Sequence, residues 1–221
     1  MFLEVKALLA DSQLARLRQL AQAMRFVDGR ATNEGFDHKR NLQADPADAA
    51  AAEASKLLAQ AMASSRAFTD FAIPRRIAPP LLARYEAGMK YGPHADAAFM
   101  AMAGARRLRS DVSCTVFLSD PSAYEGGELT LHLGVRALPI KPAAGSAILY
   151  PSTTLHEVAP VRAGVRLVAL TFIESEIPDE QERAMVYELG EISALEGDAM
   201  NWVNRMRLEV VRQNLLRKWS R

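Results

Sequence analysis

The chain has 221 residues, of which 49% are hydrophobic, so it can bury a sizeable core and is too apolar for a disordered protein. Lysine and arginine number 27 against 26 aspartates and glutamates, which gives none of the basic footprint of a nucleic-acid-binding protein. The single cysteine, Cys114, excludes an intrachain disulfide and a cysteine zinc cluster. Without a long apolar stretch or a secretory signal, we expect a cytoplasmic globular protein with no nucleic-acid or membrane partner.

The first 66 residues are typical of a short strand followed by two helices. Residues 2–5 predict the strand, and apolar residues at helical spacing predict a helix from about Asp11 to Met24. Residues 27–45 form a polar connection with two glycines. Asp45 followed by Pro46 predicts the start of a second, alanine-rich helix that extends to about Arg66.

From residue 81 the chain changes to short β-branched or aromatic runs separated by Gly, Pro and Asp. Six strands are predicted, at 81–86, 112–118, 128–133, 135–140, 146–150 and 165–173. Strands this short, without helices between them, favour an antiparallel sandwich or barrel over a parallel sheet. After Pro178 the pattern becomes helical again. These last helices either cover an apolar face of the same chain or form a dimer contact.

Two of the four histidines lie in sequence contexts that suggest a metal site. His94 and Asp96 are two residues apart, so on an extended strand their side chains face the same side. His156 begins a further extended segment, and its imidazole could complete a set of two histidines and one carboxylate. Such a set occupies one face of an octahedral metal ion and leaves three positions open, as in non-haem Fe(II) oxygenases.

Arg166 follows His156 on the next predicted strand. We expect a short turn at 160–164 to bring Arg166 back beside the metal on an adjacent strand. Its neighbours in sequence are apolar, so a buried guanidinium there needs an anionic partner. A carboxylate held by two parallel hydrogen bonds is such a partner, whereas the alternative is an arginine that points outward.

A resemblance to a known family is carried by the order Tyr85-x-x-Gly88-x-x-Tyr91-x-x-His94-x-Asp96, then Thr115, then Glu125-Gly126-Gly127-Glu128-Leu129, then His156 and Arg166. This order resembles the prolyl/lysyl-hydroxylase-like branch of the Fe(II)/2-oxoglutarate dioxygenases, and more closely the PKHD-type hydroxylases of the PiuC/YbiX group. The resemblance covers nearly the whole chain.

The resemblance implies an α+β fold with a double-stranded β-helix (jelly-roll) core and N-terminal supporting helices. Residues 1–176 would form the dioxygenase domain, with the β-core at about 81–174. Residues 177–221 would form a C-terminal helical extension, packed on the core or at a homodimer contact. In this family His94, Asp96 and His156 match the iron ligands, and Arg166 matches the residue that binds the distal carboxylate of 2-oxoglutarate.

Two further residues match co-substrate contacts of the family. Tyr85 matches a tyrosine that helps to bind the distal carboxylate, and Thr115 matches a threonine that contacts the co-substrate. The implied cofactors are Fe(II), 2-oxoglutarate and O2, with ascorbate as a candidate reductant. The implied reaction hydroxylates an unactivated C–H bond while 2-oxoglutarate is converted to succinate and CO2.

The substrate stays open between a small molecule and a peptidyl group, and the resemblance links the family to iron acquisition. Residues 97–109 carry Arg106, Arg107 and Arg109. If this loop is a lid, its arginines would suit an anionic substrate. The alternative is a loop whose arginines are solvated. The rival class is a non-oxygenase cupin-like metal-binding protein or isomerase, which would not need both Arg166 and Tyr85 near the histidines.

Overall fold

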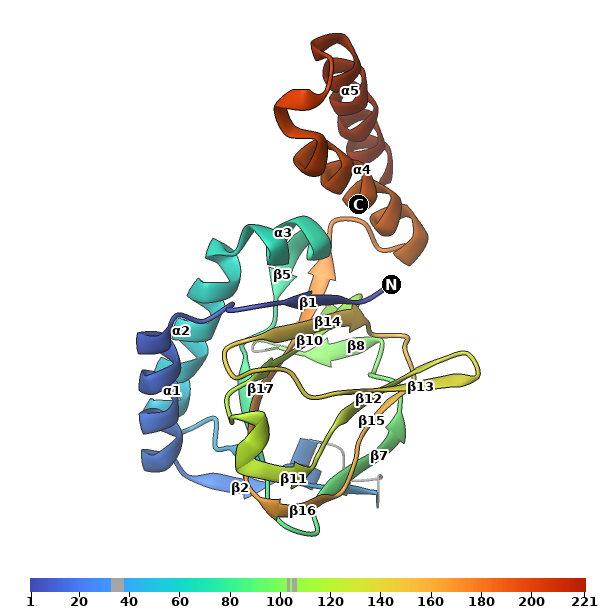
Figure 1. Ribbon diagram of the computed structural model, residues 1–221. Coiled ribbons are helices and arrows are strands. Elements are labelled where there is room, and N and C mark those ends of the chain that lie inside the picture. Colours follow the sequence, from blue (N-terminus) through green and yellow to red (C-terminus); the bar gives the residue numbers. More distant parts are fainter. Residues whose placement is uncertain (33–37, 103, 105–106) are drawn as a thin grey trace.

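The computed structural model describes residues 1–32, 38–102, 104 and 107–221. Figure 1 shows β-sheets that face each other, helices along the outer side of one sheet, and a helix pair that projects from the β-core. The helices are α1 (Asp11–Ala23), α2 (Ala49–Ser64), α3 (Arg66–Ala72), α4 (Glu180–Glu196) and α5 (Trp202–Trp219), with short 3-10 helices at Gly29–Thr32, Pro121–Ala123 and Gly197–Ala199.

The larger sheet has the strand order β1-β14-β10-β17-β6-β4-β2, and β5 also pairs with β17. Its strands are β1 (Leu3–Val5), β2 (Phe26–Asp28), β4 (Leu42–Ala44), β5 (Pro74–Ile77), β6 (Leu81–Tyr85), β10 (Val112–Phe117), β14 (Ala147–Pro151) and β17 (Arg166–Ser175). The pairings among these described strands are antiparallel.

The opposing sheet has the order β13-β12-β15-β7-β3. Its strands are β3 (Lys39–Arg40), β7 (Lys90–His94), β12 (Leu129–Leu133), β13 (Arg136–Ile140) and β15 (His156–Val158). Two short pairs join β8 (Phe99–Ala101) to β9 (Arg107–Arg109) and β11 (Tyr124–Gly126) to β16 (Val161–Gly164). This combination of helices with antiparallel sheets agrees with the expected α+β class.

The apolar core lies on both sides of the larger sheet. One cluster joins the helices to the outer face of the sheet and contains Leu17 of α1, Leu58 of α2 and Val116 of β10. A second cluster fills the space between the sheets and contains Phe117 of β10 and Leu131 of β12. Because successive strand residues point to opposite faces, β10 contributes alternate side chains to the two clusters. The side chains of β10 that point inward can therefore contribute to a site between the two sheets.

The second helix begins later than the sequence predicts, and a further short helix follows it. Asp45 accepts a hydrogen bond from the N–H of Ala47 in a turn, and Asp48 caps α2 by accepting one from Ala50. The helical segment is interrupted at Ser65, whose hydroxyl caps α3. Such caps satisfy N–H groups that have no partner within the helix. The helix expected up to about Arg66 is therefore α2, which ends at Ser64, and α3 follows it as a separate helix that the sequence did not predict.

The α4–α5 pair projects from the β-core (Figure 1). Asp179 caps α4, and the N–H of Arg221 donates to the carbonyl of Glu176, so the end of the chain returns to the start of the pair. None of the α5 side chains is buried. Among the described helices, none combines the length and the apolar composition that a membrane span requires.

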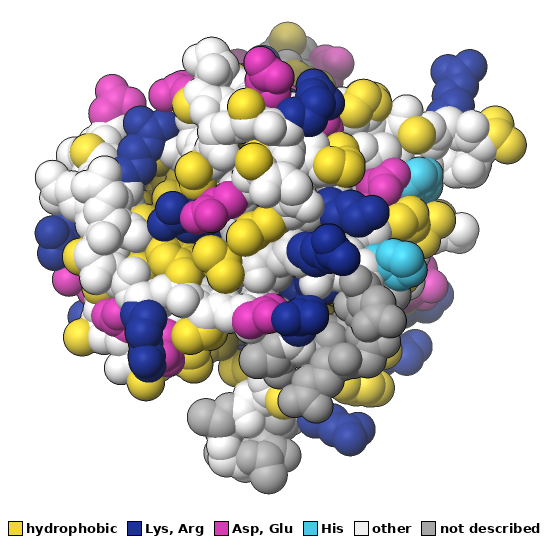
Figure 2. Space-filling view, turned by 90° about the horizontal axis from the view of Figure 1, so that it is seen from below, with side chains coloured by type: hydrophobic (Ala, Val, Ile, Leu, Met, Phe, Trp, Pro, Cys, Tyr) yellow, Lys and Arg dark blue, Asp and Glu magenta, His cyan; other side chains and the backbone are white. Residues whose placement is uncertain are grey.

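Figure 2 shows the end of the molecule at which β2, β11 and β16 lie. Lysine and arginine side chains stand among aspartate and glutamate side chains on this face, with apolar side chains between them. This mixture agrees with the net charge of +1.

Candidate active site

A cavity of about 520 Å³ lies between the two sheets. Its lining contains all six residues singled out by the sequence, namely Tyr85, His94, Asp96, Thr115, His156 and Arg166. The structure therefore brings together, at one cavity, residues that are as far as 81 positions apart in the sequence (166 − 85 = 81).

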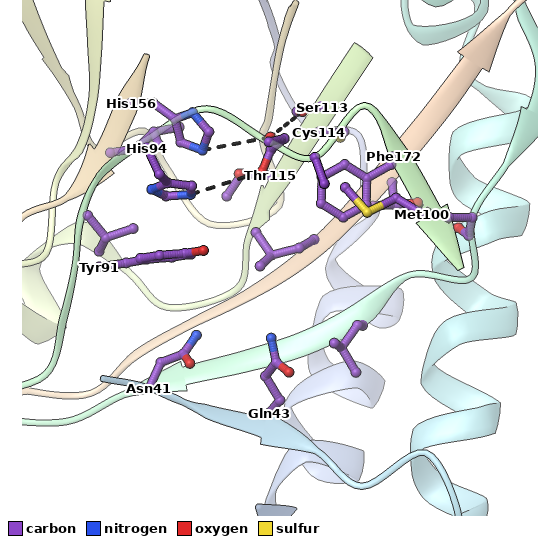
Figure 3. A pocket seen from close by; sticks show the side chains of 18 of the residues that line it. Asn41, Gln43, Tyr91, His94, Met100, Ser113, Cys114, Thr115, His156 and Phe172 are labelled. Carbon is purple, nitrogen blue, oxygen red and sulfur yellow. Dashed lines mark hydrogen bonds and ion pairs between the residues drawn. The ribbon is translucent and has the colours of Figure 1, made fainter. Parts of the chain in front are cut away.

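His94 and His156 occupy opposite positions on neighbouring antiparallel strands, β7 and β15. The Asp96 carboxylate oxygens lie 4.0 Å from Nε2 of His94 and 3.8 Å from Nε2 of His156. One ligand atom from each of the three residues lies within 4.8 Å of the others (Figure 3). Asp96 follows the end of β7, so the expectation that it shares an extended strand with His94 is wrong, although the two side chains do converge.

Backbone carbonyls determine which imidazole nitrogens face Asp96. Nδ1 of His94 lies 2.8 Å from the carbonyl oxygen of Gly92, and Nδ1 of His156 lies 2.9 Å from that of Thr154. Because a carbonyl only accepts hydrogen bonds, each Nδ1 carries a hydrogen, and in the neutral imidazole Nε2 has the lone pair. Burial, followed by the nearby His156, lowers the pKa of His94 to about 4. Both nitrogens that face Asp96 are thus suited to a metal ion.

Aromatic rings fix the planes of the two imidazoles. The Tyr91 ring stacks on His94 with 3.6 Å between ring centres and an angle of 16°. The Tyr150 ring packs edge-on against His156 at 4.9 Å. Both histidines are therefore restrained by a ring contact as well as by a backbone hydrogen bond.

Arg166 reaches the cavity from the larger sheet. It begins β17, which pairs with β6 and β10, whereas His156 lies on β15 of the opposing sheet. The expectation that a turn at 160–164 would return Arg166 on a strand adjacent to His156 is therefore wrong. The intervening residues form β16, which pairs with β11, and the chain then crosses to the other sheet. The side chain of Arg166 nevertheless lines the same cavity.

The guanidinium of Arg166 is buried without an acidic partner among the described residues. Arg166 is only 1% exposed, and its Nε and Nη1 have no hydrogen-bond partner in the described part of the chain. Its central carbon lies 4.9 Å from the centre of the Tyr85 ring and 5.4 Å from that of Phe117. Burial lowers the pKa of Arg166. Because burying an unpaired cation is unfavourable, this site fits an anionic ligand.

Tyr85 and Thr115 are both buried at the cavity. The Tyr85 hydroxyl accepts a hydrogen bond from Nδ2 of Asn41 at 3.1 Å. Burial raises the pKa of Tyr85, so the hydroxyl stays protonated and its hydrogen can be donated to a second group. Thr115 lies on β10, next to β17.

Several residues of the cavity were not predicted from the sequence. Lys39, Asn41 and Gln43 line the cavity from β3, from the residue between the two strands and from β4, in a segment expected to be a polar connection. Ser113 on β10 bonds Asp96, and Phe172 on β17 lines the cavity (Figure 3). Alternation of polar side chains was the available signal for the first three residues, but it is also typical of exposed strands.

Part of the expected recognition loop lies outside the described residues, namely 103, 105 and 106, which include Arg106. The neighbouring residues form the β8–β9 pair, from which Met100 lines the cavity. Arg109 instead donates to Asp111 at 2.8 Å and to the carbonyl of Ser175 at 3.1 Å. Arg107 lies over the Phe99 ring at 5.8 Å. Neither of these two arginines contributes to the cavity lining.

Comparisons with known proteins agree with this site. Residues 80–174 match the 2OG-Fe(II) oxygenase superfamily. The chain is 52% identical to a PKHD-type hydroxylase from Sphingopyxis alaskensis, over 97% of both chains. It is similar in fold to a prolyl hydroxylase from Trichoplax adhaerens, which was solved in complex with a peptide fragment of the hypoxia inducible factor oxygen degradation domain. The TM-score is 0.61 at 21% identity, and the match covers 83% of this chain and 86% of that one. A prolyl-4-hydroxylase from Pseudomonas putida gives a TM-score of 0.57 at 19% identity, covering 78% of this chain and 92% of that one.

Proposed function

Because the chain belongs to the PKHD-type hydroxylases, within the 2OG-Fe(II) oxygenase superfamily, we propose that it binds Fe(II) through His94, Asp96 and His156 and binds 2-oxoglutarate through Arg166. The protein is an Fe(II)- and 2-oxoglutarate-dependent dioxygenase. One observation carries the residue assignment: three metal-ligand side chains and a buried guanidinium that lacks an acidic partner among the described residues line the same cavity. A cupin-like metal-binding protein or isomerase needs no such guanidinium.

The three ligand side chains fit a ferrous ion. Two neutral imidazole nitrogens and one carboxylate oxygen leave positions open for a co-substrate. Iron and 2-oxoglutarate held by these residues would supply, together with O2, the oxidising chemistry for C–H hydroxylation, with 2-oxoglutarate converted to succinate and CO2. His94 and His156 would present their Nε2 atoms in fixed orientations, because their Nδ1 hydrogens are engaged by backbone carbonyls.

Arg166 would bind the distal carboxylate of 2-oxoglutarate through two parallel hydrogen bonds. The Tyr85 hydroxyl already accepts from Asn41, so it can donate its hydrogen to the same carboxylate. We assign Thr115 to a contact with the co-substrate because its buried side chain lines the same cavity. These groups orient the co-substrate, and the apolar residues around them exclude water.

The far part of the cavity supports an apolar substrate group. Leu170 and Phe172 lie four and six residues beyond Arg166 on β17, which places Phe172 about 20 Å along the strand from Arg166. Leu81 pairs with Leu170, and Met100 adds a further apolar side chain to the lining. We propose that a hydrocarbon part of the substrate occupies this end. A peptidyl side chain and a small molecule can both present such a group.

Product analysis tests this function. The enzyme would be incubated with Fe(II), 2-oxoglutarate, O2 and ascorbate, together with proline- and lysine-containing peptides or small molecules that carry aliphatic groups. We expect a substrate to increase succinate release and to gain one oxygen atom. His156→Ala should abolish both signals, whereas Val135→Ala, at a fully exposed position, should retain them. Failure of the folded wild-type protein to convert 2-oxoglutarate under any of these conditions would contradict the proposal.

We also infer that the core is a double-stranded β-helix (jelly roll) in a dioxygenase domain at residues 1–176, and that residues 177–221 are a C-terminal extension. The facing antiparallel sheets and the fold shared with the prolyl hydroxylases support the first inference. The projection of α4 and α5 from the core, with no buried side chain on α5, supports the second (Figure 1).

A homodimer through α5 is supported by its exposed apolar face. Trp202, Met206 and Val210 are 72%, 49% and 53% exposed, and they lie four residues apart, hence on one face. These three side chains line a surface groove on α5, and Arg217 lines the same groove toward the end of the helix. In an antiparallel pairing of two α5 helices about a two-fold axis near Val210, Trp202 of each copy would lie against Arg217 of the other. A guanidinium over an indole is an attractive contact, and a two-fold axis forms it twice.

Sedimentation of the wild-type chain and of Trp202→Glu tests this contact. We expect a wild-type dimer and a monomeric Trp202→Glu variant with an unchanged melting temperature. Val135→Glu is the matched control, since Val135 is exposed on another part of the chain. A monomeric wild type, or a dimer that survives Trp202→Glu, would exclude this interface.

A further inference from the structure

We propose that Ser113, supported by Ser152 and Ser110, is a positioning residue that holds the Asp96 carboxylate in its metal-binding orientation. The inference rests on the proposed function and deepens it. Oγ of Ser113 donates a hydrogen bond to Oδ2 of Asp96 at 2.5 Å (Figure 3). Ser113 is 2% exposed and the Asp96 side chain is 12% exposed, so water competes little for this bond.

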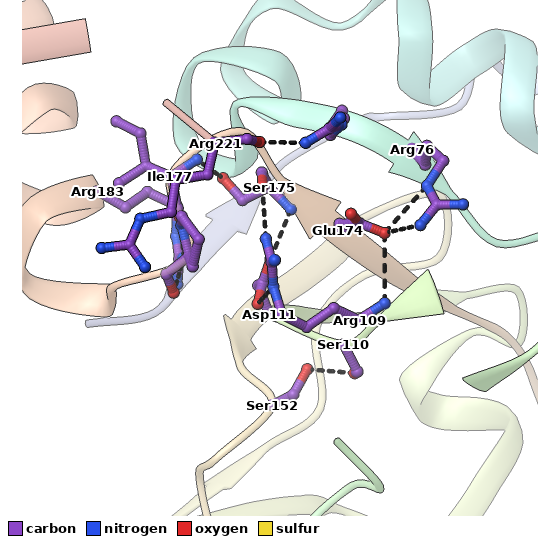
Figure 4. Close-up of polar contacts among 12 residues, drawn as sticks. Arg76, Arg109, Ser110, Asp111, Ser152, Glu174, Ser175, Ile177, Arg183 and Arg221 are labelled. Atoms are coloured by element: carbon purple, nitrogen blue, oxygen red, sulfur yellow. Dashed lines mark hydrogen bonds and ion pairs between the residues drawn. The ribbon is translucent and has the colours of Figure 1, made fainter. Parts of the chain in front are cut away.

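The three serine hydroxyls form one directed chain. Oγ of Ser152 lies 2.7 Å from Oγ of Ser113. It also lies 2.8 Å from Oγ of Ser110 (Figure 4). An ionised carboxylate only accepts, and each hydroxyl has one hydrogen to donate. The Ser113 hydrogen therefore goes to Asp96, that of Ser152 goes to Ser113, and that of Ser110 goes to Ser152. Each hydrogen bond polarises the next one in the chain. The bond from Ser113 to Asp96 is also strengthened by the negative charge of the carboxylate.

Asp96 needs such support because it lies beyond the end of β7, where no strand pairing restrains it. Its N–H donates to the carbonyl of Ser152 at 3.2 Å, and the N–H of Ser152 donates to the carbonyl of Asp111 at 3.1 Å. Ser113 belongs to β10 of the larger sheet, while Ser152 lies in the segment that leads to His156. The serines therefore connect one ligand both to the larger sheet and to the segment carrying another ligand.

Only one oxygen of the Asp96 carboxylate is engaged in this way. Oδ2 accepts from Ser113, and within the described residues no hydrogen bond reaches Oδ1. Rotation of the carboxylate would break the charge-assisted bond to Ser113. Without that bond, metal binding must also fix the carboxylate orientation, at a cost in conformational entropy. Ser113 thus acts on metal affinity through Asp96 and does not itself touch the metal.

Anaerobic Fe(II) titration of the full chain tests the proposal. We expect Ser113→Ala to weaken Fe(II) binding by about 10–100-fold, the usual effect of removing a hydrogen-bond partner of a metal ligand. Ser113→Thr keeps the hydroxyl and should bind Fe(II) nearly as tightly as the wild type. Ser175→Ala removes another buried hydroxyl, one that contacts only backbone groups, and should leave the Fe(II) affinity unchanged. Affinity of the iron-saturated Ser113→Ala protein for 2-oxoglutarate should also be retained.

The possible failures can be told apart. A wild-type protein that does not bind Fe(II) would overturn the proposed function. A wild type that binds Fe(II) together with a Ser113→Ala variant of equal affinity would overturn only the role of Ser113. Equal weakening in Ser113→Ala, Ser113→Thr and Ser175→Ala, with lowered melting temperatures, would show a general structural effect and would also overturn it. If Ser113→Ala does not fold, Ser152→Ala carries the same test, because it removes the donor to Ser113.

Discussion

Arg166 and Tyr85 occupy opposite positions in the antiparallel pairing of β17 with β6, and the central guanidinium carbon lies 4.9 Å from the centre of the Tyr85 ring. An aromatic face attracts a cation, so this register holds the guanidinium in place before a ligand binds. Nε and Nη1 remain without hydrogen-bond partners among the described residues. The pair is therefore preorganised for an anion, which lowers the entropy cost of binding.

Replacing Arg166 should weaken 2-oxoglutarate binding and spare metal binding. Losing one partner of a buried charge pair costs about 2–5 kcal/mol, so Arg166→Ala should raise the Kd for 2-oxoglutarate by roughly 30-fold or more. Arg166→Lys keeps the charge but loses the two-pronged geometry, and should give an intermediate value. Anaerobic titration of the Fe(II)-loaded protein measures these constants. Equal constants for Arg166→Ala and wild type would show that the distal carboxylate binds elsewhere.

Tyr85→Phe should distinguish the contribution of the Tyr85 hydroxyl from that of its ring. The ring contact with Arg166 is retained, while the hydroxyl that accepts from Asn41 is lost. One hydrogen bond contributes about 0.5–1.5 kcal/mol net, so the Kd for 2-oxoglutarate should rise by about 2–10-fold. Tyr187→Phe, on α4, is the control. Calorimetric titration that finds the same Kd in both variants would remove Tyr85 from the co-substrate contacts.

Two glycines provide a matched test of the space around Arg166. Gly127 and Gly134 have similar positive φ values, 65° and 64°, so alanine strains the backbone in both by roughly 1–2 kcal/mol. A Cβ on Gly127 would lie 3.1 Å from Cδ of Arg166 and 2.9 Å from Cγ2 of Val161, whereas one on Gly134 meets nothing within 4 Å. Both variants should lose thermal stability, but only Gly127→Ala should weaken 2-oxoglutarate binding. The same Kd in both would show that Gly127 acts only through the backbone.

The chemistry of the site could be predicted from the sequence, but its strand connections could not. His94, Asp96, His156 and Arg166 stand in the residue order of a known family, and all line one cavity. The connection from His156 to Arg166 depends on long-range strand pairing, which the number of residues between them does not reveal. Residues 161–164 pair with β11, where a Cβ on Gly164 would lie 2.2 Å from the carbonyl of Ala123. This close packing forms an additional strand where a simple turn was expected.

Residues that support the ligands were also hidden in the sequence, because inward-facing polar side chains follow the same alternation as exposed ones. Ser113 on β10 has buried neighbours on both sides, yet a serine in a strand carries no sign that it bonds a carboxylate 17 residues away. Asn41 and Gln43 lie in a segment that resembles a loop by composition and is partly β-strand. Their roles become apparent only when the two sheets face each other.

Metal binding should stabilise the folded protein. At a free metal concentration 100 times the Kd, binding to the native state adds about 2.7 kcal/mol, which for a chain of this size raises the Tm by roughly 5–10 °C. Scanning calorimetry with Co(II), which replaces Fe(II) in air, should show this rise for wild type and for His132→Ala. His156→Ala should show little or none. A full rise in His156→Ala would place the bound ion at another site.

Acid should reduce the stabilisation from Glu174 at the end of β17. Burial opposes ionisation of this group, but hydrogen bonds from Arg76 and from the N–H of Arg109 hold the pKa of Glu174 below its usual value of 4.5 (Figure 4). The pKa of Glu174 is lower in the folded chain than in the unfolded chain, so the unfolded chain binds more protons as the pH falls. The stabilisation by ionised Glu174 is therefore fully present above pH 4.5 and is lost as the pH falls through the folded pKa.

Urea unfolding of Glu174→Gln checks this sign. The variant should be less stable than wild type at pH 7, and the difference in the free energy of unfolding should shrink as the pH falls below 4.5. Glu196→Gln, at an exposed position on α4, should show no such narrowing. A difference for Glu174→Gln that is constant with pH would mean that its ionisation does not contribute.

The visible absorption of the anaerobic protein with Fe(II) and 2-oxoglutarate tests most directly whether His94, Asp96 and His156 hold the iron while Arg166 holds the co-substrate. The wild type should develop a metal-to-ligand charge-transfer band, Asp96→Ala should not, and Arg166→Ala should require more 2-oxoglutarate to reach it. A folded, iron-loaded wild type without the band, or an Asp96→Ala variant with the full band, would contradict this assignment.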